Sequence, residues 1–507
     1  MTMVAPGRAD QPVRSGSVAP RLPARSLRAL LEDVPRAEIR GRDVAVSGLA
    51  YRTQDVEHGS LFFCVPGTRR DGHDLAPDAL AHGAAALVVD RPLTLDVPQA
   101  IVRSVREAMG PVAASFYGHP AGAMTVVGVT GTNGKTTTTY LLEALFASTG
   151  HTAGVVGTTG IRIDGRTTPF PRTTPEAPDL HHLFREMADR GVDAVAMEVS
   201  SHGLEQHRVG GVRFAAAVFT NLTQDHLDFH GTMDAYFEAK ARLFTPDLTD
   251  ATVINVDDAA GRRLVERVRG DVPVTTYAVD RDADVRAVAV ETSAEGVVFQ
   301  VDGVEVRSAL RGRFNVDNAL AAFATARALG IEDATAAEAI ATVRGVPGRV
   351  EPVEAGQDFL VLVDYAHTPD SVENVLRAAR PLATGHVIVV LGCGGDRDRA
   401  KRPLMGRAAT ANADLTVLTS DNPRSEDPLA ILADIEPGAG EGGGRFVVEP
   451  DRRAAIRLAV GEARPGDVVV IAGKGHEPYQ ELADRTIAFD DREVAAEEIR
   501  AVGSVAP

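Results

Sequence analysis

Residues 125–137 read TVVGVTGTNGKTT, and this stretch decides the fold of the chain. A run of apolar and β-branched residues comes first and predicts a strand. A glycine-rich turn that ends in Lys135 and Thr136 follows, and residues 138–146 then predict a helix. A strand, a glycine-rich turn and a helix in this order aim backbone N–H groups and a helix N-terminus at an anion. The stretch therefore predicts a phosphate-binding loop within an α/β domain.

The individual residues of this loop suit phosphate binding. Gly131 and Gly134 let the backbone approach phosphates closely, Lys135 can reach the terminal phosphates, and the Thr136 hydroxyl can bind Mg²⁺. The general P-loop pattern places a glycine five residues before Gly134, where this chain has Val129, so the loop is a compact variant. An ordinary glycine-rich turn is the alternative interpretation, but the flanking strand and helix favour phosphate binding.

Length and composition bound the class of protein. The 507 residues predict about three domains, and a 44% share of hydrophobic residues is enough for several cores. A formal net charge of −17 argues against general nucleic-acid binding, so an anionic ligand needs a locally basic pocket. The two cysteines, Cys64 and Cys393, lack metal-ligand spacing, which indicates a reducing compartment and argues against disulfides and a zinc site.

Targeting signals are absent from the sequence pattern. No apolar run is long enough to span a membrane. Residues 1–25 are rich in Pro, Ala and Arg but lack the apolar stretch of a signal peptide, so we expect a disordered tail there. We expect a cytoplasmic monomer with no nucleic-acid partner and no membrane span.

The pattern of strands and helices predicts an α/β protein of three domains. We expect a small N-terminal α/β domain over residues 26–123, with strands at 43–46, 60–65 and 84–89 and a helix at 77–82. The central domain, residues 124–346, contains the P-loop. Its strands at 153–157, 194–199 and 215–219 alternate with helices such as 178–191, which predicts a parallel, doubly wound sheet. A hairpin with an Asp302-Gly303 turn is expected to be an antiparallel appendage to this sheet.

The third predicted domain, residues 347–507, is a Rossmann-like α/β unit without a phosphate loop of its own. Apolar strands are expected at 359–363, 386–391, 415–419 and 468–472. Helical patterns lie between them, at 371–380, 402–413 and 452–462.

Polar side chains follow the central strands of the predicted parallel sheet. Glu198 ends one buried strand, and Asn221, Asp225 and His226 follow the next. Because ligands bind at the carboxyl ends of such strands, these side chains are expected near the P-loop. A buried acid is costly unless it is paired or bound to a metal, so Glu198 is a candidate Mg²⁺ ligand.

Three further cations are ambiguous by themselves. Lys240 lies in a helical pattern, and that stretch alone predicts an exposed helix lysine. Arg397 and Arg424 each follow a predicted strand and lie beside acidic residues, where they could grip a carboxylate with two hydrogen bonds. Such an arrangement suits a zwitterionic amino acid, and ordinary surface ion pairing explains it equally well.

Together these motifs resemble the Mur ligase family, ATP-dependent enzymes that build the peptide stem of bacterial peptidoglycan. The resemblance runs from about Leu49 to about Asp491, and its motifs are GTNGKTT at 131–137, EVSSHGLEQHR at 198–208, DYAHTP at 364–369 and DNPR at 421–424. In the family, the last motif accompanies 2,6-diaminopimelate, whereas lysine-adding relatives alter its arginine. The resemblance thus implies an ATP-dependent amide ligase. Through an acyl phosphate, it would add diaminopimelate to UDP-N-acetylmuramoyl-L-alanyl-D-glutamate and release ADP and phosphate.

The resemblance also implies roles for individual residues. Nucleotide contacts fall on Gly131, Thr132, Asn133, Gly134, Lys135, Thr136, Thr137, Arg349, Asp364 and either Asn315 or Asn318. Contacts to the muramoyl dipeptide nucleotide fall on Leu49, Tyr51, Thr173, Thr174, Ser200, Gln206 and Arg208. Diaminopimelate contacts fall on Arg397, Asp421, Asn422, Pro423, Arg424, Gly473 and Glu477.

The resemblance also implies catalytic and metal-binding residues, some of which are among the nucleotide contacts. The catalytic residues would be Lys135, Glu198, His226 and Lys240. Mg²⁺ would be held by Thr136, Glu198, His226 and Lys240, the last as a CO₂-derived carbamate (N6-carboxylysine). This role would reverse the expectation of an exposed Lys240.

The sequence departs from the family pattern at two places. The N-terminal uridine motif is usually Asp-Ser-Arg, whereas this chain has Ala50-Tyr51-Arg52, so Tyr51 replaces a serine that contacts the uridine nucleotide. Arg172 stands where some relatives have an asparagine. The contacts to the nucleotide sugar therefore stay open.

Other functions remain open at this stage. A lysine-adding Mur ligase is disfavoured by Arg424, and folylpolyglutamate synthase, which shares the fold and loop, is disfavoured by the long N-terminal domain. A P-loop NTPase switch or scaffold would need no amino-acid pocket. The meso and LL isomers of diaminopimelate are not distinguished, because the same arginine and carboxylate groups could hold either.

Overall fold

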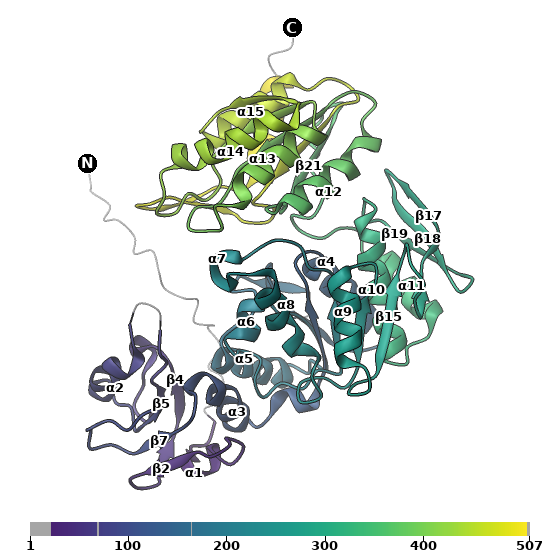
Figure 1. Ribbon diagram of the computed structural model, residues 1–507. Coiled ribbons are helices and arrows are strands. Elements are labelled where there is room, and N and C mark those ends of the chain that lie inside the picture. The colour runs from purple at the N-terminus through teal and green to yellow at the C-terminus, as the bar shows by residue number, and fades with distance from the viewer. Residues whose placement is uncertain (1–21, 68–69, 164, 504–507) are drawn as a thin grey trace. The chain divides into compact units, whose positions relative to one another are not determined.

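The computed structural model describes residues 22–67, 70–163 and 165–503 (Figure 1). They divide into two units. One contains the described residues up to Pro120 together with Ala177–Arg190, and the other contains Ala121–Glu176 and the described residues from Gly191 onward. Most of the expected disordered tail, residues 1–21, lies outside the described residues, whereas Arg25 already begins strand β1 (Arg25–Ser26). No helix in the described ranges is long and apolar enough to cross a membrane.

The first unit is built on a five-stranded sheet of order β2-β7-β6-β5-β4. Strands β4 (Gly48–Ala50), β5 (Ser60–Phe63), β6 (Ala86–Val89) and β7 (Gln99–Ile101) are parallel, and β2 (Glu38–Arg40) is antiparallel to β7. The strands expected at 60–65 and 84–89 are β5 and β6, and both are buried throughout. The strand expected at 43–46 is only the short β3 (Ala45–Val46), which pairs with β1.

Four helices accompany this sheet: α1 (Leu27–Leu30), α2 (Ala76–Ala81), α3 (Val105–Tyr117) and α5 (Ala177–Asp189). Helices α2 and α5 lie within a residue or two of the predicted 77–82 and 178–191. Although α5 was assigned to the central domain from its place in the sequence, it packs against α3 and belongs to the first unit. Sequence order alone could not reveal this, because the amphipathic face of a helix does not specify its partner.

The second unit contains a nine-stranded sheet of order β11-β10-β9-β12-β8-β13-β14-β15-β16. Its strands are β8 (Thr125–Thr130), β9 (Ala153–Gly157), β10 (Gly160–Ile163), β11 (Arg166–Thr168), β12 (Ala194–Glu198), β13 (Ala216–Phe219), β14 (Thr252–Asn255), β15 (Val274–Ala278) and β16 (Val285–Arg286). All neighbouring strands pair in parallel except at one edge, where β10 is antiparallel to both β9 and β11. The predicted parallel sheet is therefore confirmed.

The order of these strands creates a switch point at β8. The chain leaves β8 for β9, returns through β12 on one side of β8, and then continues to β13 on the other side. Ligands bind at such a point because the connections on its two sides diverge and leave a crevice. The P-loop follows β8, Glu198 ends β12, and Asn221 follows β13, so all three lie at this edge.

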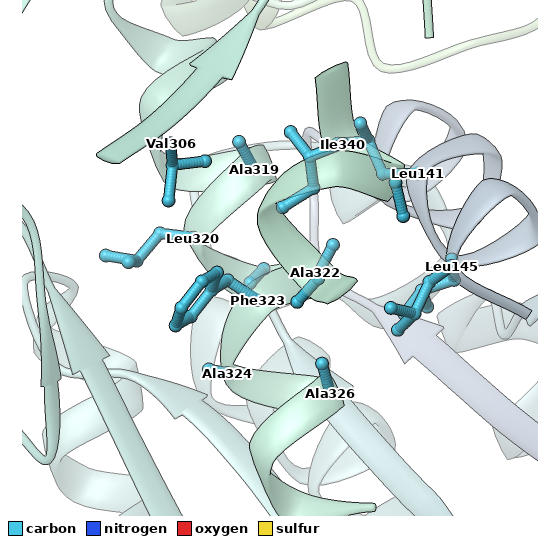
Figure 2. Close-up of a cluster of buried hydrophobic side chains, with 14 of the residues drawn as sticks. Leu141, Leu145, Val306, Ala319, Leu320, Ala322, Phe323, Ala324, Ala326 and Ile340 are labelled. Carbon is cyan, nitrogen blue, oxygen red and sulfur yellow. The ribbon is translucent and has the colours of Figure 1, made fainter. Parts of the chain in front are cut away.

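Helices α4 (Lys135–Ser148), α10 (Phe314–Ala328) and α11 (Asp333–Thr342) pack together beside the sheet. Figure 2 shows their shared core, in which Leu141 and Leu145 of α4 lie close to α10 and Ile340 of α11. Phe323 of α10 is completely buried in this core. The many alanines of α10 keep its surface smooth and allow close contact with neighbouring elements.

The predicted Asp302-Gly303 hairpin is confirmed between β18 (Gly296–Val301) and β19 (Val304–Ser308). The φ angles of 49° at Asp302 and 86° at Gly303 are those of a tight turn with two left-handed residues. With β17 (Val288–Ser293) the hairpin forms its own three-stranded sheet, so the expected attachment to the main sheet is wrong. Its apolar face packs into the core around α10 and α11, which holds it in place without a shared ladder.

The rest of the second unit carries a six-stranded sheet of order β20-β21-β25-β22-β23-β24. Its strands are β20 (Glu351–Pro352), β21 (Leu360–Asp364), β22 (Val387–Leu391), β23 (Leu415–Leu418), β24 (Arg445–Val448) and β25 (Val468–Ala472), all parallel except β20. The four predicted strands are β21, β22, β23 and β25. A short hairpin of β26 (Tyr479–Glu481) and β27 (Thr486–Ala488) follows them.

Helices cover both faces of this sheet. Helices α12 (Pro369–Ala379), α13 (Lys401–Asn412) and α14 (Pro428–Gly442) share one core, and α15 (Arg452–Glu462) and α16 (Asp491–Gly503) contribute to the other. Alternate residues of β25 face the two cores, as a doubly wound sheet requires. Helix α14 was not predicted, because Pro437 and the glycines around it are typical of a loop.

Truncating Phe323 tests the core in Figure 2. We expect Phe323→Ala to lower the free energy of unfolding by about 3–5 kcal/mol, since a buried ring leaves a cavity that the helices cannot fill. The control is Val288→Ala on β17, where the side chain is 47% exposed and a change within about 0.5 kcal/mol is expected. Guanidinium unfolding would measure both, and equal shifts would contradict this account of the core.

Candidate active site

The glycine-rich loop between β8 and α4 depends on two glycines. Gly131 has φ 149° and Gly134 has φ 87°, so both occupy backbone conformations that favour glycine. A Cβ atom at Gly131 would overlap Thr220 Oγ1, and one at Gly134 would overlap Asn318 Oδ1. Gly134 is the N-cap of α4, so the loop ends at a helix N-terminus, which favours an anion.

Two lysines meet at one carbonyl of this loop. Lys135 Nζ donates to the Gly131 carbonyl at 3.0 Å and to the Thr132 carbonyl at 2.8 Å. Lys240 Nζ, on α8 (Met233–Ala241), donates to the same Gly131 carbonyl at 2.7 Å and lies 4.5 Å from the centre of the Tyr236 ring. The expectation of an exposed Lys240 is wrong, since its exposure is 1%. Its helix lies against the loop, a tertiary contact that the local pattern does not contain.

This arrangement shifts the pKa values of both amines. Burial, reinforced by the neighbouring Lys135 charge, holds the pKa of Lys240 well below its usual range. Burial also lowers the pKa of Lys135, which the negative charge of Glu198 partly offsets. A buried lysine with a lowered pKa can carry an uncharged, nucleophilic amine.

Glu198 lies at the end of β12 with an exposure of 1%. Its carboxylate accepts hydrogen bonds from the Thr136 hydroxyl at 2.9 Å and from the Thr158 backbone N–H and hydroxyl at 2.9 and 3.0 Å. Arg349 Nη2 donates to Thr136 Oγ1 at 2.9 Å. A chain of hydrogen bonds thus runs from Arg349 through Thr136 to Glu198.

The segment that contains Arg349 and Asp364 borders the loop. The Arg349 guanidinium lies 4.6 Å from the centre of the Tyr365 ring, and Asp364 accepts a hydrogen bond from the Val350 backbone N–H at 2.8 Å. Burial raises the pKa of Asp364. Asn133 of the loop donates to Asp370 Oδ2 at 2.8 Å, which joins the loop to the start of α12.

A cavity of about 880 Å³ lies between these segments. Such a volume lies within the usual range for small-molecule and cofactor sites. Its lining includes Thr132, Asn133, Gly134, Lys135, Thr136, Thr137, Glu198, Asn318, Arg349 and Asp364. Of the two asparagines considered from the sequence, Asn318 lines the cavity, and Asn315 supports it by accepting a hydrogen bond from Asn318 Nδ2 at 2.8 Å.

His226 belongs to a neighbouring cluster of rings. It has φ 55°, and its ring meets that of His202 edge-on at a centroid distance of 4.8 Å. Burial lowers the pKa of His226 to about 2, so the imidazole is neutral and its nitrogens can act as ligands. The described ranges contain no group of three or more His, Cys, Asp and Glu side chains arranged to hold a metal ion. Glu198 and His226 therefore do not form a ready-made metal cage.

Asp225, beside His226, links the loop after β13 to α13. Its Oδ1 lies 3.2 Å from Lys401 Nζ, and its Oδ2 lies 3.7 Å from His367 Nε2. Although burial raises the pKa of Asp225, contacts with His367 and Lys401 hold it well below its usual range. Sequence reasoning missed Lys401, because a lysine at the start of a helix is ordinarily a surface residue.

The residues expected at the dipeptide site form a hydrogen-bonded group within the second unit. Thr174 Oγ1 donates to the Glu198 carbonyl at 2.9 Å and accepts from the Ser200 N–H at 3.0 Å. Arg208 donates to the Thr174 carbonyl at 3.1 Å and to Gln206 Oε1 at 2.6 Å. Thr173 is joined to Thr158 through their hydroxyls, at 3.0 Å.

The other two residues expected at the dipeptide site, Leu49 and Tyr51, lie in the first unit and pack against its core. The Tyr51 hydroxyl donates to Asp179 Oδ2 of α5 at 2.6 Å. The side chain that departs from the family pattern is thus held by a partner about 130 positions further along the chain, which no local pattern indicates.

The residues expected to bind diaminopimelate gather at the carboxyl end of the six-stranded sheet. Asn422 Nδ2 donates to Glu477 Oε2 at 2.8 Å, and Arg424 Nε donates to Glu481 Oε2 at 3.0 Å. A Cβ atom at Gly473, which has φ 114°, would overlap Asp421 Oδ2. Pro423 lies between Asn422 and Arg424, so its position follows from theirs. Arg397 is exposed and donates to the Asp396 carbonyl at 3.0 Å.

Comparison with protein families matches most of the chain. The description "Mur ligase family, catalytic domain" matches residues 45–117, "Mur ligase middle domain" matches 129–326, and "Mur ligase, glutamate ligase domain" matches 348–475. These matches fall on the three sheets in turn and confirm the expected three-domain α/β fold.

Two curated relatives carry the name UDP-N-acetylmuramoyl-L-alanyl-D-glutamate--2,6-diaminopimelate ligase. The protein of Geobacillus thermodenitrificans is 48% identical over 481 residues, which cover 92% of this chain and 98% of that protein. The protein of Streptomyces avermitilis is 47% identical, over 92% of this chain and 96% of that protein. A solved structure of an enzyme with the same name is 35% identical, with a TM-score of 0.65 over 90% of this chain and 95% of that chain.

Substituting a loop glycine tests the geometry of the nucleotide cavity. We expect Gly134→Ala to weaken ADP binding at least about tenfold, because the new methyl group would meet Asn318 Oδ1 in a strained backbone. Gly150→Ala is the matched control, since Gly150 has φ 85° and no atom within 4 Å of the added carbon. Calorimetric titration would measure both, and equal affinities for ADP would contradict the assigned contact.

Proposed function

Because the chain belongs to the Mur ligase family, we propose that this ATP-dependent ligase joins 2,6-diaminopimelate to UDP-N-acetylmuramoyl-L-alanyl-D-glutamate. The observation that carries this proposal is the group of Asp421, Asn422, Arg424 and Glu477 at the end of the six-stranded sheet. A cation and several carboxylates on one edge complement the charges of a diamino dicarboxylic acid.

ATP would bind in the cavity at the P-loop. The N-terminus of α4 and the Lys135 ammonium can neutralise the phosphates, while Arg349 and Asp364 border the cavity from the opposite segment. Asn318 would lie near the base. The γ-phosphoryl group would then pass to the D-glutamate carboxylate of the dipeptide, which forms an acyl phosphate and ADP.

Thr136, Glu198, His226 and a modified Lys240 are the proposed Mg²⁺ ligands. The Thr136 hydroxyl and the Glu198 carboxylate are adjacent hard-oxygen donors, which suit Mg²⁺. Mg²⁺ commonly uses one or two carboxylates together with substrate phosphates, so a cage of three acidic or imidazole side chains is not needed. When bound, the ion would neutralise charge on the transferring phosphoryl group.

We propose that Lys240 is carbamylated. Its amine is buried beside a second lysine, and in the described part of the chain its hydrogen-bond partner is the Gly131 carbonyl rather than a carboxylate. Attack of the uncharged nitrogen on CO₂ forms an N–C bond and releases one proton. The product is an anion, which can pair with the neighbouring Lys135 ammonium.

The acyl phosphate solves the central chemical problem of the ligation. A free carboxylate resists attack by an amine because oxide is a very poor leaving group, whereas phosphate leaves readily from the tetrahedral intermediate. Arg397 and Arg424 would grip carboxylates of the incoming amino acid and orient its amino group for the attack. Exclusion of water by the surrounding segments would protect the acyl phosphate from hydrolysis.

The remaining assignments complete the proposal. The dipeptide nucleotide would contact Leu49, Tyr51, Thr173, Thr174, Ser200, Gln206 and Arg208. We place the domain boundaries after residues 123 and 346, and we propose that the enzyme acts as a cytoplasmic monomer without a nucleic-acid partner.

Phosphate release from ATP tests the function directly. We expect release in the presence of the muramoyl dipeptide nucleotide to depend on diaminopimelate rather than L-lysine, because the Arg424 site requires a second carboxylate. The meso and LL isomers and L-lysine would be offered in separate reactions, and product mass would confirm the ligation. Release with L-lysine alone would overturn the role of Arg424, and release indifferent to all three would indicate an NTPase switch.

A further inference from the structure

The use of lysine in this chain is highly selective. The sequence contains 49 arginines but four lysines: Lys135, Lys240, Lys401 and Lys474. Lysine is normally a surface residue and is almost never fully buried unless paired. Here Lys240, Lys401 and Lys474 have exposures of 1%, 5% and 0%, and Lys135 is partly buried in the P-loop. No lysine therefore serves as an ordinary exposed cation.

Burial alone does not explain the choice of lysine over arginine. The chain also buries arginines completely, as in the pairing of Arg452 with Asp491 and of Arg402 with Glu426 and Asp434. The four lysines therefore mark positions where an ammonium group or an amine is needed rather than a guanidinium. Lys135 and Lys240 lie at the phosphate loop and Lys401 pairs with Asp225, which leaves the need for Lys474 to be explained.

Lys474 follows β25 and lies between two glycines with left-handed φ angles, Gly473 and Gly475. Its Nζ lies 3.3 Å from Asn422 Oδ1 and 3.4 Å from Glu477 Oε2, and it also donates to the Tyr479 carbonyl. An ammonium has three donors, and here three acceptors surround it. The longer, planar guanidinium of arginine has a different size and donor geometry and does not suit this compact site.

The contacts of Lys474 fix the orientation of two other side chains. Asn422 Oδ1 accepts from Lys474 and from the Glu481 backbone N–H at 2.9 Å, so its Nδ2 is directed to Glu477 Oε2 at 2.8 Å. Glu477 Oε2 therefore accepts two hydrogen bonds. Its other oxygen, Oε1, lies 3.4 Å from the Tyr365 hydroxyl, which leaves further acceptor capacity.

We propose that Lys474 is a positioning residue of the amino-acid site. It holds Asn422 and Glu477 so that Glu477 Oε1 can accept an ammonium group of the incoming diamino acid. The inference rests on the proposed function, because it assigns a task to Lys474 within that site. Lys474 acts through Asn422 and Glu477 and does not itself touch the substrate.

The test compares Lys474→Met and Lys474→Arg with the wild-type enzyme in the phosphate-release assay. Both variants should raise the KM for diaminopimelate about tenfold or more, because methionine removes the charge-assisted partner of Glu477 and Asn422 and the arginine guanidinium does not fit among the same acceptors. The KM values for ATP and for the dipeptide nucleotide should stay within about threefold, since neither substrate depends on Glu477. Arg453→Met removes a partly exposed cation that pairs with α16 and should leave all three KM values unchanged.

A double-mutant cycle distinguishes positioning from general support of the fold. If Lys474 acts through Glu477, the KM for diaminopimelate in Lys474→Met/Glu477→Gln should equal that in Glu477→Gln alone. The double variant also leaves no unpaired charge at this pair, so its KM can be measured even where Lys474→Met folds poorly.

The outcomes separate this inference from the proposed function. A wild-type enzyme without amino-acid-dependent phosphate release would refute the proposed function itself. If the wild-type enzyme is active, three results would each refute the inference alone. These are a normal KM for diaminopimelate in Lys474→Met, full rescue by Lys474→Arg, and additive effects in the cycle.

Discussion

The ammonium groups of Lys135 and Lys240 meet at the carbonyl oxygen of Gly131, and the chemistry of the site depends on this contact. Burial, reinforced by the neighbouring Lys135 charge, holds the pKa of Lys240 well below its usual range. The contact exists because Gly131 adopts a backbone conformation that carries no side chain toward Thr220. The lowered pKa of Lys240 is thus a consequence of its position against this loop.

Next to this contact, a chain of hydrogen bonds runs through the second unit from Arg349 to Thr174. Thr136 connects Arg349 to Glu198, and the Glu198 carbonyl is bonded to Thr174 of the dipeptide group. Binding of a nucleotide, of a metal and of the dipeptide would therefore act on one connected set of side chains. The amino-acid group around Glu477 is a second network with its own buried lysine, Lys474.

The sequence predicted the parts of this structure that follow from local pattern. Apolar runs located β8, β12 and β25, and the carboxyl ends of parallel strands correctly placed Glu198 at the same edge as the P-loop. The local pattern did not predict features that depend on tertiary contacts. These are the burial of Lys240, the hydrogen bond between Tyr51 and Asp179, and the separate sheet of the Asp302-Gly303 hairpin. The burial of Lys401 and Lys474 also depends on tertiary contacts, with Asp225 and with Asn422, that the local pattern does not contain.

Detection of a carbamate on Lys240 would test this account most directly. Enzyme equilibrated with ¹³C-labelled bicarbonate would be examined by ¹³C NMR, with the Lys240→Ala variant as the reference. The account predicts one protein-bound carbamate carbon in the wild-type spectrum that is missing from the variant, because Lys135 donates to two backbone carbonyls and Lys401 and Lys474 lie beside the carboxylates of Asp225 and Glu477. A wild-type spectrum without this signal, or a signal that persists in Lys240→Ala, would contradict it.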